Sequence, residues 1–247
     1  MSHQQGDANS KMNKHSPAGP LNVLFIGNSF TARNNVPGLI AQLAGSRGKE
    51  LKHRLISAGG ASLRMHWNKG EAQKAIEQTH YDYVVLQEQS TLPIKNALRM
   101  HENIRLFDGA IKASGAKTAL YLTWARQNVP ETQKALTNAY VAIADELDAV
   151  IVPVGVAWEN LILKHRSPVL HDKDKSHPTL AGSYLAACVF FAVLFGENPV
   201  GIAGNLKGMT QEEVELLQET AWSTAQEGLN AKTQRRKDAK VHTKKEN

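Results

Sequence analysis

The chain has 247 residues, a single cysteine and a formal net charge of +6. With 42% hydrophobic and 21% charged residues, it has a globular composition and enough length for one substantial core, so we expect one folded domain. The lone thiol, Cys188, excludes an internal disulfide and does not indicate an oxidising compartment. The sequence contains neither His-Glu-x-x-His nor a Cys/His cluster, so it indicates no metal and no cofactor.

The two ends of the chain differ from its middle. Residues 1–20 are polar and lack the apolar region of a signal peptide, so we expect a disordered segment and a cytoplasmic protein, or an exported one if a native leader has been removed. Residues 233–247 are strongly basic without aromatic residues, which is typical of a solvated, disordered tail. A weak contact with nucleic acid or anionic lipid is the alternative, but we expect no nucleic-acid partner. The folded domain is predicted over 21–232.

Five apolar runs have the length and composition of buried strands. In chain order they are 22–26, 51–57, 83–87, 117–124 and 149–154. Segments of helical length separate them. This alternation predicts an α/β fold with a doubly wound parallel sheet between two helical layers.

Two helices are predicted near the C-terminus. Residues 179–195 carry no charge, with Pro178 suited to a first helical turn and Gly196 to a stop. This run is shorter than the roughly 20 residues needed to span a bilayer, so we interpret it as a buried core helix and expect no transmembrane segment. A second helix is predicted over 210–229, with Thr210 as its N-cap.

A nucleophile and its base can be chosen from the sequence. Ser29 follows the first predicted strand, and the residue beyond the carboxyl end of a parallel strand lies in the ligand crevice. A serine hydroxyl needs an imidazole to take its proton and a carboxylate to orient that imidazole. His177 and Asp174 supply both, with Asp172 as a competing acid at a less favourable spacing. Gly27 would allow a tight turn before the serine.

These residues resemble the motifs of the SGNH (GDSL-like) hydrolase family. Gly27 and Ser29 match its first block, in a branch that has Gly-Asn-Ser-Phe-Thr in place of Gly-Asp-Ser-Leu, so that Asn28 replaces the usual aspartate. Asp174 and His177 match its last block. The resemblance implies a flavodoxin-like strand order and a serine esterase that forms an acyl-enzyme. The implied substrates are short acyl esters, above all O-acetyl groups, on small molecules or carbohydrates.

The oxyanion hole is less clearly marked. The N–H groups of Ser29 and Gly60 match two of the family's donors, but the third block, Gly-x-Asn, is missing. Gln87 and Gln89 follow the third predicted strand and carry the same kind of amide donor. Alternation puts both on one face, with Gln89 farther out, so we predict Gln89 as the third donor and Gln87 as the alternative. Between them, Glu88 is interpreted as a solvated loop carboxylate.

Two further possibilities remain at this stage. The missing third block is compatible with a non-catalytic ligand-binding module on the same fold. The four tryptophans could line a sugar-binding crevice, although aromatic residues in a chain of this size are mostly core. The order of the motifs excludes an α/β-hydrolase, which would place Gly-x-Ser-x-Gly in mid-chain, and a Rossmann domain, which would need Gly-x-Gly-x-x-Gly. His66, His101 and His171 are interpreted as surface or packing residues.

Overall fold

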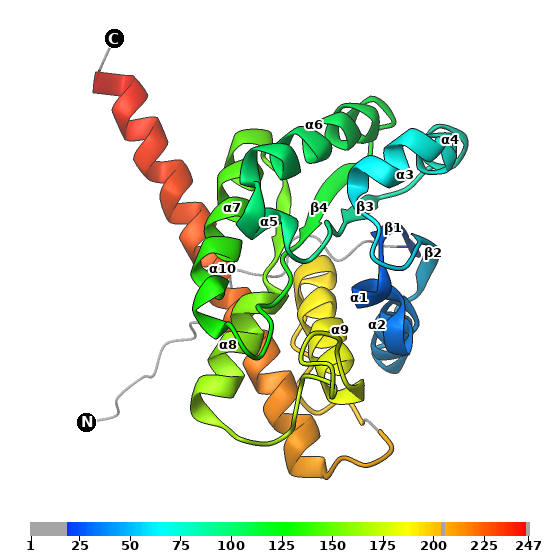
Figure 1. Cartoon of the computed structure of the whole chain (residues 1–247), viewed down its shortest axis with the longest axis vertical. Helices are drawn as coiled ribbons and strands as arrows, with labels where there is room; N and C mark the ends of the chain where they lie inside the picture. The colour runs from blue at the N-terminus through cyan, green and yellow to red at the C-terminus, as the bar shows by residue number, and fades with distance from the viewer. Residues whose placement is uncertain (1–18, 204–205, 246–247) are drawn as a thin grey trace, which may run out of the picture.

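A five-stranded parallel sheet forms the centre of the molecule (Figure 1). The computed structural model describes residues 19–203 and 206–245. The strands are β1 (Leu21–Gly27), β2 (Leu51–Ser57), β3 (Tyr83–Leu86), β4 (Lys117–Tyr121) and β5 (Val150–Val152). Their order is β2-β1-β3-β4-β5, so the predicted fold class is confirmed. Strand β4 ends at Tyr121, before the end of the predicted run at residue 124.

Helices cover both faces of the sheet. One layer holds α1 (Ser29–Ala32), α2 (Val36–Ser46), α8 (Val154–Lys164), α9 (Leu180–Phe195) and α10 (Gln211–Lys245). The other layer holds α3 (Leu63–Lys69), α4 (Glu71–Gln78), α6 (Ala97–Ala113) and α7 (Gln133–Leu147). Short helical turns connect these elements: η1 (Arg33–Asn35), α5 (Leu92–Lys95) and η2 (Pro130–Thr132).

Strand β1 is buried on both faces. Val23 and Phe25 pack into the layer of α2 and α9, whereas Leu24 and Ile26 pack into the layer of α3 and α6. Burial on both faces explains why the strand is a continuous apolar run rather than an alternating one. Because β1 also lies between β2 and β3, the residues that follow it emerge between the loops that follow those two strands.

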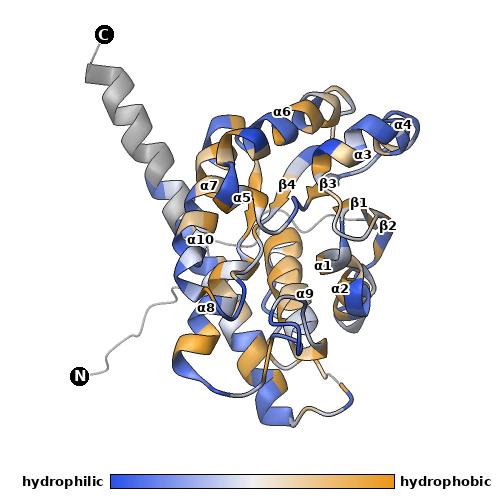
Figure 2. Cartoon of the chain, viewed as in Figure 1, coloured by the Kyte–Doolittle hydropathy of each residue, from blue (hydrophilic) through white to orange (hydrophobic). Residues whose placement is uncertain are grey.

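Helix α9 has the buried, uncharged character that the sequence predicts (Figure 2). Its N-cap is Thr179, whose hydroxyl accepts a hydrogen bond from Gly182 N–H at 3.2 Å, so Pro178 precedes the cap instead of occupying the first turn. The helix ends at Gly196, where a φ of 67° suits a residue without Cβ. No helix in the described part of the chain is long and apolar enough to cross a bilayer.

Helix α10 starts as predicted but continues farther. Thr210 and Glu213 cap it reciprocally: Glu213 N–H donates to the threonine hydroxyl, and Thr210 N–H donates to the glutamate carboxylate. The helix runs to Lys245, so residues 233–245 are helical where we expected a disordered tail. Lys, Arg, Gln and Ala dominate that stretch and are good helix formers. The prediction for residues 1–20 falls almost entirely outside the described residues.

Candidate active site

Ser29 is the first residue of α1, and only Asn28 separates it from the end of β1. The turn before it depends on close packing rather than on an unusual backbone angle. A Cβ on Gly27 would lie 2.6 Å from Oε1 of Gln87 and 2.9 Å from Oγ1 of Thr31. Glycine is therefore needed at position 27 for space, whereas the sequence suggested a need for turn flexibility.

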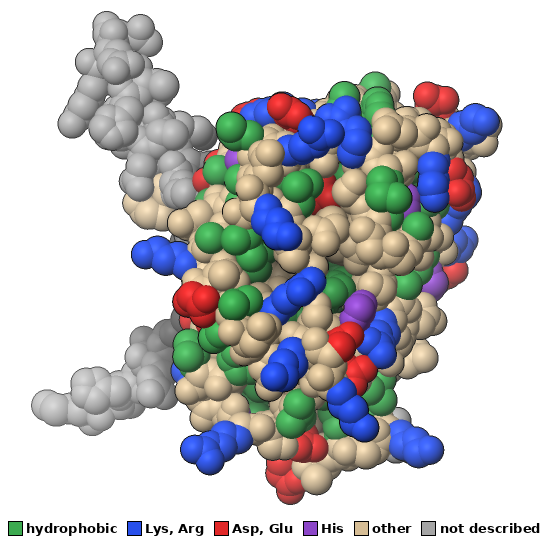
Figure 3. All heavy atoms as spheres, in the orientation of Figure 1, with side chains coloured by type: hydrophobic (Ala, Val, Ile, Leu, Met, Phe, Trp, Pro, Cys, Tyr) green, Lys and Arg blue, Asp and Glu red, His purple; other side chains and the backbone are tan. Residues whose placement is uncertain are grey.

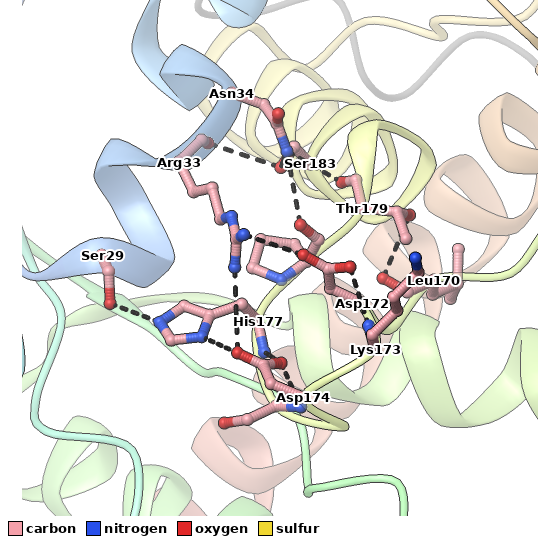
Figure 4. A network of polar contacts seen from close by, with 12 residues as sticks. Ser29, Arg33, Asn34, Leu170, Asp172, Lys173, Asp174, His177, Thr179 and Ser183 are labelled. Carbon is pink, nitrogen blue, oxygen red and sulfur yellow. Dashed lines mark hydrogen bonds and ion pairs between the residues drawn. The ribbon is translucent and has the colours of Figure 1, made fainter.

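Ser29, His177 and Asp174 lie in line across the carboxyl edge of the sheet (Figure 4). Ser29 Oγ is 2.8 Å from Nε2 of His177, and Nδ1 of the same ring is 2.5 Å from Oδ2 of Asp174. A carboxylate can only accept, so the ring carries its proton on Nδ1 and leaves Nε2 free to accept the serine proton. The three residues predicted from the two ends of the sequence thus meet with the connectivity of a catalytic triad.

The loop before α9 fixes the carboxylate of Asp174 by itself. The other oxygen of Asp174, Oδ1, accepts hydrogen bonds from the backbone N–H groups of His177 at 2.9 Å and Ser176 at 3.0 Å. The hydrogen bond from the His177 ring, followed by those from the backbone, lowers the pKa of Asp174 well below its usual range. The carboxylate is therefore ionised at any pH at which an imidazole could act as a base.

Asp172 has a different partner. Its carboxylate is 2.8 Å from the guanidinium of Arg33, which also lies 3.9 Å from Asp174 (Figure 4). Arg33 directly follows α1, so this ion pair connects the segment bearing Ser29 to the loop bearing His177. Asn34 adds a second connection by donating to the carbonyl of Thr179 at 3.0 Å. Sequence reasoning missed both Arg33 and Asn34, because neither belongs to a motif.

A stack of aromatic rings packs against His177 and the loop that carries it. Trp124 lies between Phe30 and Trp158, with ring centroids 4.7 Å and 3.9 Å away and nearly parallel planes. Its indole N–H donates to the carbonyl of Ser176 at 3.0 Å, and Phe30 meets the ring of His177 edge-on at 5.5 Å. Trp124 and Trp158 are almost fully buried, which agrees with the core interpretation of these tryptophans.

The loop after β2 lies beside Ser29 and carries Gly60. This glycine is exposed and has a φ of 65°. Asn28 holds the loop: its Nδ2 donates to the carbonyl of Ala61 at 3.1 Å, while its Oδ1 accepts from Phe30 N–H at 3.1 Å and caps α1. An aspartate could make the second bond but not the first, because a carboxylate has no donor. This gives Asn28 a physical reason where the family motif usually has aspartate.

The two candidate glutamines have different environments. Gln87 is fully buried: its Oε1 accepts from Asn28 N–H at 2.8 Å and from the hydroxyl of Thr31 at 3.0 Å. Its Nε2 donates to the carbonyl of Glu88 at 2.6 Å. The structure thus uses the Gln87 amide to hold the turn before Ser29, and the side chain has no exposed surface from which its NH₂ group could reach a substrate.

Gln89 is half-buried and is anchored only by its oxygen. Its Oε1 accepts from the N–H groups of Thr91 and Leu92, at 2.9 Å and 3.0 Å, and from the Thr91 hydroxyl at 3.0 Å. Because backbone N–H groups are donors, the atom facing them is the oxygen, and the NH₂ group points the other way. We find no hydrogen bond for that NH₂ group among the described residues. The same is true of the backbone N–H groups of Ser29 and Gly60.

Glu88 is not the solvated carboxylate that we expected. It is fully buried, and its carboxylate contacts the loop after β2 and helix α6. His66 is also buried, and its Nε2 lies 2.7 Å from the carbonyl of Gly27. Both side chains tie α3 and the loop before it to the ends of the central strands. Periodicity could not reveal either one, since each lies outside the apolar pattern. Across residues 19–203 and 206–245, no group of three potential ligands is placed to hold a metal.

Comparison with known proteins agrees with the fold. No family model matches the chain, and no curated protein matches it in sequence. Among solved structures, a candidate SGNH hydrolase from Slackia heliotrinireducens is 25% identical, with a TM-score of 0.64 over 71% of this chain and 100% of that one. A DUF4886 family protein from Bacteroides uniformis is 20% identical, with a TM-score of 0.69 over 83% and 94% of the two chains.

An esterase is also similar in structure. A variant of an acetyl-xylooligosaccharide esterase from Geobacillus is 17% identical, with a TM-score of 0.60 over 76% of this chain and 99% of that one. The chain therefore has the fold of the SGNH hydrolases, and the Slackia structure supports its place among them. They also support a hydrolase as the general class of activity.

Proposed function

We propose that this chain is a serine esterase of the SGNH type, in the branch with Gly-Asn-Ser-Phe-Thr, and that it removes short acyl groups through an acyl-enzyme. The observation that carries the proposal is the line of contacts from Ser29 Oγ through His177 to Asp174, at 2.8 Å and 2.5 Å. Burial or packing alone would not require a serine hydroxyl, an imidazole and a carboxylate to share this geometry. It is the arrangement that makes a hydroxyl nucleophilic.

The proposed reaction has two halves. In the first, Ser29 Oγ bonds to the ester carbonyl carbon while His177 Nε2 takes the hydroxyl proton. His177 then returns this proton to the departing alcohol as the ester C–O bond breaks. In the second, His177 takes a proton from water as the water oxygen bonds to the acyl carbon. His177 then returns this proton to Ser29 Oγ as the bond between Oγ and the acyl carbon breaks, which releases the acid and free Ser29. Throughout both halves, Asp174 accepts a hydrogen bond from the Nδ1–H group of His177 and stabilises the imidazolium.

Negative charge develops on the carbonyl oxygen in both halves. We assign its stabilisation to the backbone N–H groups of Ser29 and Gly60 and to the NH₂ group of Gln89, three donors that lie on neighbouring segments and have no acceptor among the described residues. Preorganised donors of this kind typically contribute a large share of catalysis in acyl transfer. Gln87 is left out of this set because its side chain is fully buried and holds the turn before Ser29.

The proposed substrates are O-acetyl and similar short esters, including those of carbohydrates. Support comes from the resemblance in the motifs and from a structural neighbour that is an acetyl-xylooligosaccharide esterase. On the face drawn in Figure 3, lysine and arginine side chains are scattered among neutral and acidic ones and do not form one patch. The absence of a nucleic-acid partner stays a prediction.

Covalent labelling tests this proposal. A fluorophosphonate reacts readily only with a serine that a neighbouring base activates, so we expect one adduct, mapped by peptide mass spectrometry to Ser29 and lost in Ser29→Ala. The wild-type protein should also hydrolyse p-nitrophenyl acetate. A folded wild-type protein that is neither labelled nor active would contradict the esterase and favour a ligand-binding module on the same fold.

A further inference from the structure

Glu88 is a carboxylate with no exposed surface, and it lies between the end of β3 and helix α6. Its Oε1 accepts two backbone hydrogen bonds, from Leu63 N–H at 3.0 Å and from Gln89 N–H at 2.7 Å. Leu63 is the first residue of α3 and directly follows the loop that carries Gly60, whereas Gln89 is in the loop after β3. A single oxygen atom therefore joins the two loops on either side of Ser29.

The second oxygen joins the same carboxylate to α6. Nδ2 of Asn103 donates to Oε2 of Glu88 at 2.8 Å, and Oδ1 of Asn103 accepts from Nε of Arg64 at 3.0 Å. Asn103 is itself buried, and Arg64 is in the first turn of α3, next to Leu63. The network thus runs from Arg64 in α3 through Asn103 in α6 to Glu88, and from Glu88 back to Leu63 in α3. We call it the Glu88 circuit.

The direction of each bond in this circuit is fixed. The guanidinium of Arg64 can only donate, so Asn103 must present its oxygen to Arg64 and its NH₂ group to position 88. The two backbone N–H groups are donors as well. Position 88 therefore faces three donors, and an ionised carboxylate is the side chain that accepts all of them.

Burying a carboxylate is costly. Loss of water raises the pKa of Glu88, and the hydrogen bonds from Asn103, Gln89 and Leu63 oppose that rise. Replacing a buried charged network by apolar residues is often neutral or stabilising, so stability alone is a weak reason for Glu88. Holding two loops at a fixed separation is a function that an apolar side chain could not perform.

We propose that Glu88 is a positioning residue that fixes the loops of Gly60 and Gln89 around the developing oxyanion. This inference rests on the proposed function, because those loops carry two of the three assigned donors. Glu88 does not touch the substrate in this scheme. Its effect falls on the transition state, where the donor positions matter most, and it should therefore change kcat much more than KM.

The circuit offers a reciprocal test. In Glu88→Gln, a neutral amide must donate toward Asn103, which can accept only by turning its own NH₂ group against Arg64. In Asn103→Asp, two carboxylates face each other. When both substitutions are combined, every donor again meets an acceptor. The oxygen of the introduced glutamine takes both backbone N–H groups, its NH₂ group donates to the introduced aspartate, and that aspartate accepts from Arg64.

We expect each single variant to lower kcat for p-nitrophenyl acetate by roughly 10- to 100-fold with KM nearly unchanged, since displacement of catalytic groups by about 1 Å has effects of this size. The double variant should recover to within about threefold of the wild type, as expected for strongly coupled neighbours. Circular dichroism and thermal unfolding show whether each variant folds. If Glu88→Gln fails to fold, Asn103→Asp and the double variant still give the comparison.

Asp108→Asn is the matched control. Asp108 is a buried carboxylate on the same helix, and it accepts from the hydroxyl of Thr118 at 2.7 Å and pairs with Lys112 at 2.8 Å. Thr118 lies at the amino end of β4, away from the site. This variant should change thermal stability and leave kcat unchanged.

The possible failures are distinguishable. A folded Glu88→Gln variant with wild-type kcat, or a folded double variant that stays as impaired as the single ones, would overturn the role of Glu88 while Ser29 is still labelled in the wild-type protein. Absence of Ser29 labelling in the wild type would overturn the proposed function, and the role of Glu88 with it.

Discussion

Substitutions at Gln87 and Gln89 should affect different properties of the protein, although the two residues are one pleat repeat apart. Gln87 is fully buried and makes three hydrogen bonds, to Asn28 N–H, the Thr31 hydroxyl and the Glu88 carbonyl. Gln89 is anchored by its oxygen at the start of α5. We therefore predict that Gln87→Ala lowers stability, whereas Gln89→Glu lowers turnover.

The magnitudes follow from the contacts. Gln87→Ala leaves buried partners unpaired at a cost of about 1 kcal/mol or more each, so the free energy of unfolding should fall by about 3 kcal/mol. For a domain of this size each kcal/mol corresponds to roughly 2–4 °C, which gives a drop in Tm of roughly 6–12 °C. Gln89→Glu keeps an oxygen for Thr91 and Leu92 but removes the NH₂ group. Its Tm should stay near that of the wild type, and kcat should fall by roughly 10²-fold, the usual effect of deleting an oxyanion donor.

Thermal unfolding by circular dichroism and steady-state hydrolysis of p-nitrophenyl acetate measure the two effects on the same preparations. Gln89→Ala serves as a second variant, which also loses the anchor at α5. The reasoning is refuted if Gln87→Ala keeps its Tm and loses kcat while Gln89→Glu keeps kcat, because the donor would then be Gln87. If neither variant changes kcat, the oxyanion hole consists of backbone N–H donors alone.

Three further predictions concern other parts of the site and the chain. Asn28→Asp should lower kcat by roughly tenfold or more, because it replaces a donor that holds the loop after β2 with a second acceptor; unchanged kinetics would show that the bond is not needed. His177→Ala should lower kcat by roughly 10⁴-fold and Asp174→Asn by less, whereas Asp172→Asn should stay within about threefold, because exposed ion pairs contribute about 0–1 kcal/mol. A complete loss on changing Asp172 would identify it as the orienting acid. Truncation after Lys232 should leave hydrolysis within about twofold, because exposed charges more than a Debye length from a site are largely screened at ordinary salt; a large loss in a folded protein would give the segment a role in the site.

The sequence was sufficient to predict the fold, since its determinants are local. Five apolar runs separated by helical lengths define a doubly wound sheet, and the stop at Gly196 needs only a residue that tolerates a positive φ. The sequence predicts that β4 extends to residue 124, beyond its observed end at Tyr121, because Trp124 belongs to a residue type that favours strands. Its side chain instead stacks on Trp158, a contact that no periodicity encodes.

The candidate site was predictable only in part. Ser29, Asp174 and His177 stand at recognisable spacings, and the structure brings them into contact. The supporting residues depend on partners from other elements: Arg33 pairs with a loop near the other end of the chain, and Glu88 is buried by α3 and α6. A charged residue just beyond the end of a strand is usually exposed to solvent, so the sequence alone predicts a solvated carboxylate at Glu88. Only the packed structure shows the donors that it accepts.

The base and its orienting acid share one short loop, whereas the nucleophile comes from the opposite end of the sequence. Asp174 accepts from the ring and from the backbone of His177, so the proton on Nδ1 is placed by contacts within four consecutive residues. The imidazole is therefore correctly tautomerised whether or not the serine is present. Folding of the whole sheet then brings Ser29, the proposed nucleophile, to this imidazole. Neighbouring residues in the sequence thus determine the tautomer of His177, whereas the proposed reactivity of Ser29 depends on the whole fold.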